Sequence, residues 1–187
     1  MKKIGILGLQ GAVQDHERHI RRCGGTPIIV KNEEELAAVD ALILPGGEST
    51  VMSRFLRVFD LTEKIKRRHH QGMPIWGICA GSILLAADVD GQRGELGLLD
   101  ITINRNAYGR HHASFEHPVM VSVFRGNVDG IFIRAPKIIN IGKSVDVLAY
   151  SGNDPVFVRQ NSLLATTFHP ELTHDSSIHS YFMAMIQ

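Results

Sequence analysis

The sequence predicts an α/β fold in which a mostly parallel central sheet carries helices on both faces and continues into an antiparallel extension. Two observations lead to this prediction. Short apolar runs alternate with longer amphipathic stretches through the first half of the chain, and this βαβα alternation is typical of a parallel sheet covered by helices. The second half instead contains strand-like segments separated by turn residues, which indicates antiparallel strands added to the sheet.

In the first half, strands and helices follow one another in turn. The expected strands are the short apolar runs Ile4–Leu7, Pro27–Val30, Ala41–Leu44 and Pro74–Ile78. The expected helices are the amphipathic stretches Ala12–Arg22, Val51–Arg67 and Ala80–Asp88. We expect the second helix to break near Asp60, where Asp60 or Thr62 would cap the helix that resumes.

The second half is rich in strands. The expected strands are Ile101–Asn104, Val119–Phe124, Ile131–Ile133, Val145–Tyr150, Val156–Arg159 and Leu163–Phe168. Turns are expected at Gly126-Asn127 and at Ser151–Asp154, because these residues favour turn conformations. A last helix is expected over Ser176–Ile186.

Composition limits the classes of protein to which the chain can belong. Its 187 residues, of which 44% are apolar and 21% charged, suit a single globular domain over residues 1–187. A net charge of +1 does not point to nucleic acid or a membrane as partner, and we expect neither a membrane span nor a signal peptide. With only Cys23 and Cys79, no disulfide framework is expected, so we predict a cytoplasmic protein with free thiols.

Cys79 lies in the strongest local motif, Gly77-Ile78-Cys79-Ala80-Gly81, which follows an apolar strand and opens a helix. This is the layout of a nucleophile elbow with Cys in place of Ser, and its glycines suit a sharp, crowded turn. The helix N-terminus favours a thiolate, and the N–H of Ala80 would face the oxygen of a tetrahedral intermediate. The alternative is a buried cysteine packed under a tight turn.

His169-Pro170-Glu171 follows the last apolar strand. In an extended segment, residues two apart project to the same side, so the Glu171 carboxylate can fix one imidazole nitrogen while the other faces a thiol as base. A solvated turn is the common explanation of such a tripeptide taken alone. Paired with the cysteine elbow, it predicts a catalytic site.

A glycine-containing loop, Pro45-Gly46-Gly47-Glu48-Ser49-Thr50, follows the third strand. Glycines allow backbone N–H groups to face an anion or a carbonyl oxygen, and the carboxyl ends of strands are where open α/β sheets bind ligands. A loop followed by a Ser49 or Thr50 helix cap is the alternative, and both interpretations are compatible.

Together, these three motifs resemble those of class I glutamine amidotransferases. More narrowly, the chain is similar nearly end to end to the glutaminase subunit of pyridoxal 5'-phosphate synthase, the PdxT family. The segments that carry this similarity are Gly8–Gly11, Pro45–Thr50, Arg105-Asn106, Ser114–Glu116, Phe132–Pro136 and Phe168–Leu172. The resemblance implies a flavodoxin-like three-layer sandwich.

The resemblance also implies roles for individual residues. Cys79, His169 and Glu171 would form a catalytic triad. The glutamine substrate would be bound by Gly47, Glu48, Ser49, Arg105, Ile133 and Arg134. The oxyanion hole would comprise Gly47, Ala80, Gln10 and Gly11. Without the resemblance, Arg105 and Arg134 would be interpreted as ordinary surface charges.

The implied reaction is hydrolysis of L-glutamine to L-glutamate and ammonia, which needs no metal and no organic cofactor. Because the glutaminase domain nearly fills the chain, we expect a separate partner protein to use the ammonia. The resemblance identifies this partner as the synthase subunit that builds pyridoxal 5'-phosphate from a pentose phosphate and a triose phosphate, so a hetero-oligomer is expected.

Other interpretations remain open. The chain could serve another amidotransferase, in histidine, anthranilate or purine synthesis; it could be a γ-glutamyl peptidase; or it could be a non-catalytic flavodoxin-like binding module.

Three sequence features suggest other sites. Gly8-x-x-Gly11 suggests a dinucleotide site but lacks the full glycine pattern. The pairs His69-His70 and His111-His112 invite a metal site, but no cysteine or carboxylate pattern completes one, so solvent-facing histidines are expected. Cys23 is expected to be a core residue or a neighbour of a helix cap.

Overall fold

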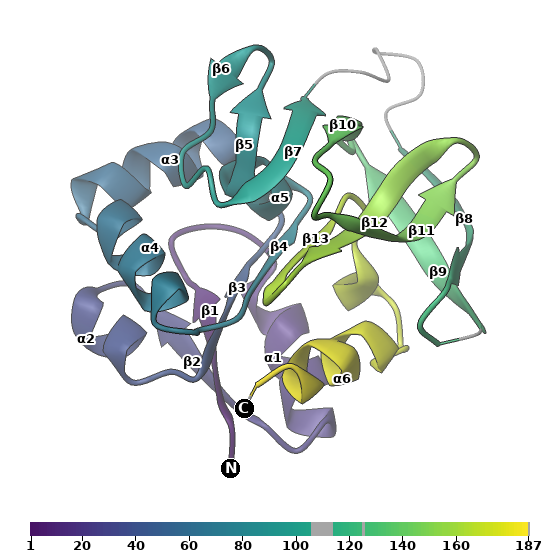
Figure 1. The fold of residues 1–187 in the computed structure, drawn as a ribbon. Helices are drawn as coiled ribbons and strands as arrows, with labels where there is room; N and C mark the ends of the chain where they lie inside the picture. Colours follow the sequence, from purple (N-terminus) through teal and green to yellow (C-terminus); the bar gives the residue numbers. More distant parts are fainter. Residues whose placement is uncertain (106–113, 125, 187) are drawn as a thin grey trace.

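A nine-stranded mixed sheet forms the centre of the computed structural model, which describes residues 1–105, 114–124 and 126–186. Its parallel part has the order β2-β1-β3-β4-β13 (Figure 1). These strands are β1 (Lys3–Leu7), β2 (Thr26–Val30), β3 (Ala41–Leu44), β4 (Ile75–Ile78) and β13 (Leu163–Thr166). The α/β class and the parallel core predicted from the sequence are confirmed.

The antiparallel extension continues this sheet from β13 in the order β12-β11-β8-β9. Its strands are β8 (Ser114–Val121), β9 (Gly126–Ile133), β11 (Asp146–Ser151) and β12 (Asp154–Gln160). The turn expected at Gly126-Asn127 is wrong, because both residues belong to β9 and pair with β8. Cross-strand pairing thus extends both strands beyond the apolar runs that predicted them.

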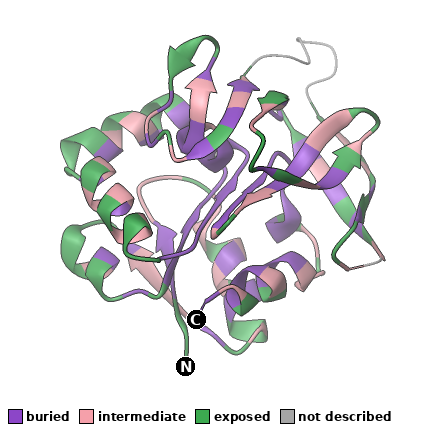
Figure 2. Ribbon diagram, in the orientation of Figure 1, coloured by how far each residue is buried: buried purple, intermediate pink, exposed green. Residues whose placement is uncertain are grey.

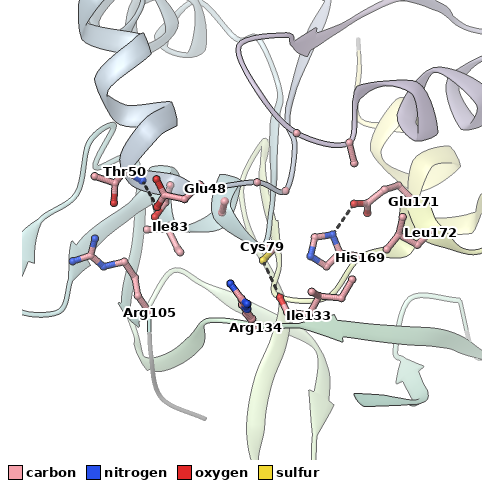
Figure 3. A pocket seen from close by; sticks show the side chains of 16 residues that line it. Glu48, Thr50, Cys79, Ile83, Arg105, Ile133, Arg134, His169, Glu171 and Leu172 are labelled. Carbon is pink, nitrogen blue, oxygen red and sulfur yellow. Dashed lines mark hydrogen bonds and ion pairs between the residues drawn. The ribbon is translucent and has the colours of Figure 1, made fainter. Parts of the chain in front are cut away.

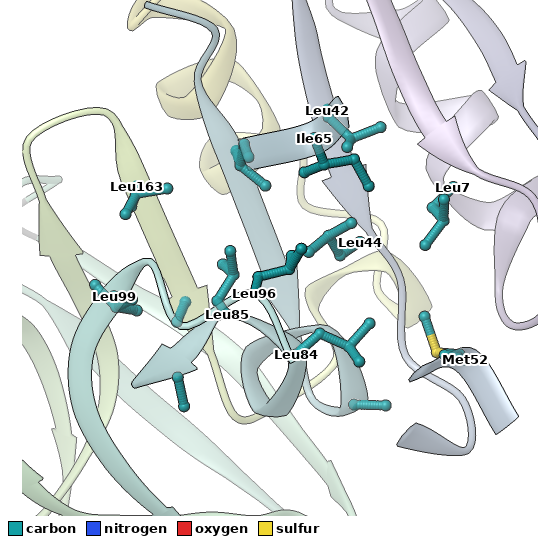
Figure 4. Packing of buried hydrophobic residues seen from close by; sticks show 14 of the residues in the cluster. Leu7, Leu42, Leu44, Met52, Ile65, Leu84, Leu85, Leu96, Leu99 and Leu163 are labelled. Carbon is teal, nitrogen blue, oxygen red and sulfur yellow. The ribbon is translucent and has the colours of Figure 1, made fainter. Parts of the chain in front are cut away.

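Helices cover both faces of the parallel strands, as expected for three layers (Figure 1). On one face lie α1 (Val13–Arg22) and α6 (Ser177–Ala184), packed over Ile43 of β3 and Trp76 of β4. On the other lie α2 (Glu33–Ala37), α3 (Ser49–Val58), α4 (Thr62–His70) and α5 (Ala80–Leu85), packed over Leu42 and Leu44 (Figure 4). Successive residues of β3 thus enter opposite cores, and the central strands are buried on both faces (Figure 2).

The helix after the cysteine is shorter than expected. The sequence predicts a helix to Asp88, but α5 ends at Leu85 and the chain continues as β5 (Ala86–Val89). The carbonyl groups of Leu84 and Leu85 accept hydrogen bonds from Leu96 and Leu98, so a distant segment satisfies the groups that another helical turn would have used. With β6 (Gln92–Arg93), β7 (Leu99–Asn104) and β10 (Lys137–Ile141), β5 forms a second sheet.

The break between α3 and α4 occurs at Asp60 as expected, but the predicted cap is wrong. Asp60 adopts φ 52°, and the N–H groups of Asp60 and Leu61 donate to the carbonyls of Arg57 and Leu56. This is a Schellman motif, which ends α3. Leu61 is the N-cap of α4 without a side-chain bond, and the Thr62 hydroxyl donates to Glu95 instead.

No helix among the residues that the structure describes is long and apolar enough to cross a membrane.

Gly81 lies where α5 approaches β3 most closely. A Cβ at Gly81 would lie 2.0 Å from the carbonyl oxygen of Leu44, and a Cβ at Gly77 would lie 2.5 Å from the carbonyl oxygen of Gly81. The obstacles are backbone atoms, which cannot rotate away. The elbow therefore needs glycine for close packing.

We expect Gly81→Ala to lower the free energy of unfolding by roughly 1–3 kcal/mol, because the added methyl group overpacks the junction of α5 and β3. Gly126→Ala is the matched control, since its Cβ would meet only Phe124 O at 3.9 Å. Urea unfolding of both variants measures the difference. Equal stability of the two variants would contradict this account of the elbow.

Candidate active site

Cys79 occupies the turn between β4 and α5. Its backbone is in the left-handed region, with φ 50° and ψ −102°, which costs free energy for any residue other than glycine and is held here by the surrounding chain. The Cys79 N–H donates to Thr166 O at 2.8 Å, and the Cys79 carbonyl accepts from Ser82 N. Strand β13 and helix α5 thereby fix the strained turn from both sides. The sulfur is largely buried and lies 3.9 Å from Ile133 O (Figure 3).

His169 and Glu171 come from the segment that follows β13. Because β13 pairs with β4 in parallel, with Thr166 opposite Ile78, the segments that leave these strands emerge side by side. His169 Nδ1 and Glu171 Oε1 are 2.7 Å apart, and both side chains are buried. Glu171 lies in a short 3-10 helix, η1 (Pro170–Leu172), so the expected extended spacing is wrong although the two side chains meet.

The charges of the three residues are coupled. Burial alone would lower the pKa of His169, but hydrogen bonding and attraction from Cys79 and Glu171 outweigh it and raise that pKa to about 10. Burial would raise the pKa of Glu171, but the hydrogen bond from His169 and attraction to the charged His169 imidazole hold that pKa below its usual value. The site therefore favours an imidazolium beside an ionised carboxylate at neutral pH.

The loop at the end of β3 forms the wall opposite His169. A Cβ at Gly46 would lie 2.4 Å from His169 Cε1, so the loop can approach the imidazole only with glycine there. The carboxylate of Glu48 accepts from the backbone N–H groups of Thr50 and Val51 at 3.0 and 2.8 Å, which lowers its pKa. Glu48 is therefore the N-cap of α3, and a Ser49 or Thr50 cap is wrong.

Gln10 connects the first loop to this wall. Its side-chain Oε1 accepts from Glu48 N at 2.8 Å. Gly11 has φ 111°, and a Cβ there would lie 1.9 Å from Gly46 O. The two loops thus interlock through positions where a larger residue would collide. Packing explains Gly11 without any dinucleotide.

The two arginines approach from different elements. Arg105 follows β7, and its Nε lies 2.6 Å from Asp90 Oδ2. Arg134 follows β9 and adopts φ 45°. Sequence reasoning missed Asp90, because nothing local to Asp90 signals a partner fifteen residues away. Asn106, grouped with Arg105 in the sequence, lies outside the described residues.

These residues surround one pocket of about 570 Å³ (Figure 3), a volume in the usual range for small-molecule sites. Of the residues that the sequence predicts for the site, only Gln10 does not line this pocket. The predicted residues that do line it are Gly11, Gly47, Glu48, Ser49, Cys79, Ala80, Arg105, Ile133, Arg134, His169 and Glu171. Ile83 and Leu172 add apolar surface that the motifs did not indicate.

His69, His70 and Cys23 do not line this pocket. His70 is exposed, but His69 is half-buried and bonds to Met73 O, so the expectation of solvent exposure is wrong for His69; His111-His112 lies outside the described residues. Among the residues that are described, no group of three or more His, Cys, Asp or Glu could hold a metal ion. Cys23 was expected in the core or beside a helix cap; it is itself the C-cap of α1 and packs half-buried against the core.

Comparison with known proteins assigns the chain to a family. The sequence profile of the SNO glutamine amidotransferase family matches residues 6–187. The pyridoxal 5'-phosphate synthase subunit PdxT of Thermotoga petrophila is 49% identical, over 99% of this chain and 100% of its own length. PdxT of Caldicellulosiruptor saccharolyticus is also 49% identical, over 98% of this chain and 97% of its own.

Solved structures agree with this assignment. A crystal structure of a glutamine amidotransferase is 39% identical and superposes with a TM-score of 0.93, with 98% of each chain covered. The structure of PurLQS from Thermotoga maritima, at 17% identity and a TM-score of 0.72, covers 99% of this chain and 96% of its own, and shows a shared fold alone. The chain therefore belongs to the SNO glutamine amidotransferase family, as its resemblance to PdxT proteins predicted.

Proposed function

We propose that the chain is the glutaminase subunit of a pyridoxal 5'-phosphate synthase. It acts as one domain over residues 1–187 and hydrolyses L-glutamine to L-glutamate and ammonia. The observation that carries the proposal is the convergence of Cys79, His169 and Glu171 in one pocket, with His169 bonded to Glu171 at 2.7 Å. End-to-end similarity to proteins named PdxT supports the choice of this amidotransferase over those of other pathways.

In the first half-reaction, the Cys79 sulfur attacks the side-chain carbonyl carbon of glutamine. The tetrahedral intermediate collapses when His169 donates a proton to the departing nitrogen, which leaves as ammonia, and a γ-glutamyl thioester remains on Cys79. The raised pKa of His169, about 10, supports this step because the imidazole carries the proton that the leaving group needs.

In the second half-reaction, His169 takes a proton from water as the water oxygen attacks the thioester carbonyl. The new tetrahedral intermediate expels the Cys79 sulfur and releases glutamate. Glu171 keeps Nδ1 of His169 protonated throughout, so that Nε2 serves as the base and acid. The buried Oε1 contact at 2.7 Å suits this orienting role.

We assign the oxyanion hole to backbone N–H groups of Gly47 and Ala80, with the Gln10-Gly11 loop shaping it. Gln10 holds the N–H of Glu48 in the present geometry, so movement of the Gln10 loop would change which donors of the neighbouring segment face the pocket. Removing one such donor typically costs about 10²–10³ in rate.

The amino-acid end of glutamine would be bound by Arg105, Arg134 and the Gly47–Ser49 loop, with Ile133 against its aliphatic stem. A guanidinium suits the α-carboxylate. Since Asp90 holds the Nε edge of Arg105, the terminal nitrogens of Arg105 would be the ones that contact the ligand.

The ammonia would pass to a synthase partner in a hetero-oligomer, because ammonia released into water is protonated and lost to diffusion. This partner would build pyridoxal 5'-phosphate, as the name of the PdxT relatives indicates for those proteins.

We expect Cys79→Ala and Cys79→Ser to abolish glutamine hydrolysis while thermal unfolding and partner binding change little, because the glycines rather than the thiol allow the turn. Glutamate production by the purified variants measures this. Persistent glutaminase activity in a folded Cys79→Ala protein would falsify the central proposal. Cys23→Ser is the matched control and should retain activity.

We expect Glu171→Gln to reduce turnover less than His169→Ala, because Glu171 orients the imidazole whereas His169 transfers the protons. Steady-state kinetics of both variants decide the order. If Glu171→Gln loses activity as completely as His169→Ala with its structure unchanged, the carboxylate has a direct chemical role instead.

We expect the isolated subunit to hydrolyse glutamine slowly. Turnover should rise by about 10²–10³ when the synthase partner is added, because one oxyanion-hole donor typically contributes a factor of that size. Turnover at saturating glutamine with and without the partner measures this gain. A high turnover that the partner does not change would contradict activation by the partner but would not contradict the proposed triad.

A further inference from the structure

Two buried polar atoms behind the triad have no hydrogen-bond partner among the described residues. Glu171 is fully buried, and its Oε1 bonds to His169 while its Oε2 has no partner. His16 is fully buried as well, and its Nε2 also has no partner. One atom is an acceptor and the other a potential donor, and buried groups of this kind normally find partners.

Helix α1 brings His16 close enough to Glu171 for the two groups to interact electrostatically. His19, almost one turn further along the helix, lies with its Nε2 3.2 Å from the main-chain oxygen of Glu171, so α1 is anchored to η1 at this residue. The charge of Glu171 acts directly on His16, where it raises the imidazole pKa against the larger effect of burial. His16 is thus a fully buried titratable group that interacts electrostatically with Glu171.

The hydrogen bond at Nδ1 of His16 determines which of its two ring nitrogens carries the proton. His16 Nδ1 lies 3.0 Å from Nε2 of His179, on α6, so one of the two must donate. If His179 Nε2–H donates, His16 Nδ1 is the acceptor and the His16 proton is on Nε2. Each tautomer leaves one N–H and one lone pair without a partner among the described residues. This tautomer places the N–H on His16 Nε2, where the negative charge of Glu171 attracts it, and the lone pair on His179 Nδ1. Burial lowers the pKa of His16 to about 4, so its imidazole is neutral at physiological pH.

We propose that His16 is a positioning residue for the triad, which donates its Nε2–H to Oε2 of Glu171, directly or through one water molecule, during catalysis. The carboxyl torsion of a glutamate is intrinsically broad, and His169 restrains only one of its oxygens. A second donor on the other oxygen fixes the plane of the carboxylate and so the orientation of the His169 ring. This inference rests on the proposed glutaminase function and extends it by one residue on α1.

The test uses the complex with the synthase partner and two variants of matched length, His16→Gln and His16→Met. Glutamine offers an N–H donor and methionine does not. We expect His16→Met to lower kcat about tenfold, in the range typical of residues that orient a catalytic group, with the KM for glutamine unchanged. We expect His16→Gln to recover most of that loss.

His19→Met is the packing control, because His19 contacts the main chain of Glu171 and the Ser176 hydroxyl but not the carboxylate. It should change kcat less than threefold. An equal loss of kcat in His16→Met, His16→Gln and His19→Met would overturn the proposal, since packing damage alone would then explain it.

A double-mutant cycle separates action through Glu171 from any other effect of His16. In a Glu171→Gln background, His16→Met should change kcat less than twofold, because the carboxylate that His16 orients is absent. A tenfold loss in both backgrounds would overturn the positioning role. A wild-type complex that hydrolyses no glutamine would overturn the proposed function itself. Normal turnover of the wild-type complex together with an unaffected His16→Met variant would overturn only the positioning role of His16.

Discussion

The parallel pairing of β4 with β13 brings together groups that lie ninety residues apart, from Cys79 to His169. With Ile78 opposite Thr166, the turn after β4 and the segment after β13 leave the same edge of the sheet. The Cys79 N–H bonds to Thr166 O, so the strained turn is held by the same strand that presents the imidazole. A slip of this register by one residue would reverse the faces of β13 and separate the two side chains.

Burial adds an electrostatic constraint to this geometry. Glu171 is withdrawn from water completely, and a buried carboxylate persists as an ion only where donors and positive charge offset the loss of hydration. His169 supplies both on one side. The ring cluster of His16 and His19 on α1 with His179 on α6 forms polar surroundings nearby.

Local sequence patterns were sufficient for the features that depend on neighbouring residues. The elbow around Cys79, the His169-Pro170-Glu171 segment and the strand Ala41–Leu44 could be predicted because a turn, a dyad and an apolar run are each written in a few consecutive residues. The short strand β5, the Asp90–Arg105 ion pair and the buried His16 depend on distant partners, and no period or motif in their own segments encodes those. Glu48 as a cap was missed because Ser and Thr are the commoner N-cap residues.

The pocket is assembled from two parts of the sheet. Cys79 and His169 stand on the parallel core, whereas Ile133 and Arg134 come from the end of β9, the outermost strand of the antiparallel extension. The outer edge of β9 pairs with no strand among the described residues, but Ile131 O of β9 accepts a hydrogen bond from the His169 N–H at 2.8 Å, so this strand also holds the proposed triad. Divergence among related enzymes would therefore have to keep the contact between Ile131 and His169 while the remainder of the extension is remodelled to suit another substrate amide or another partner surface.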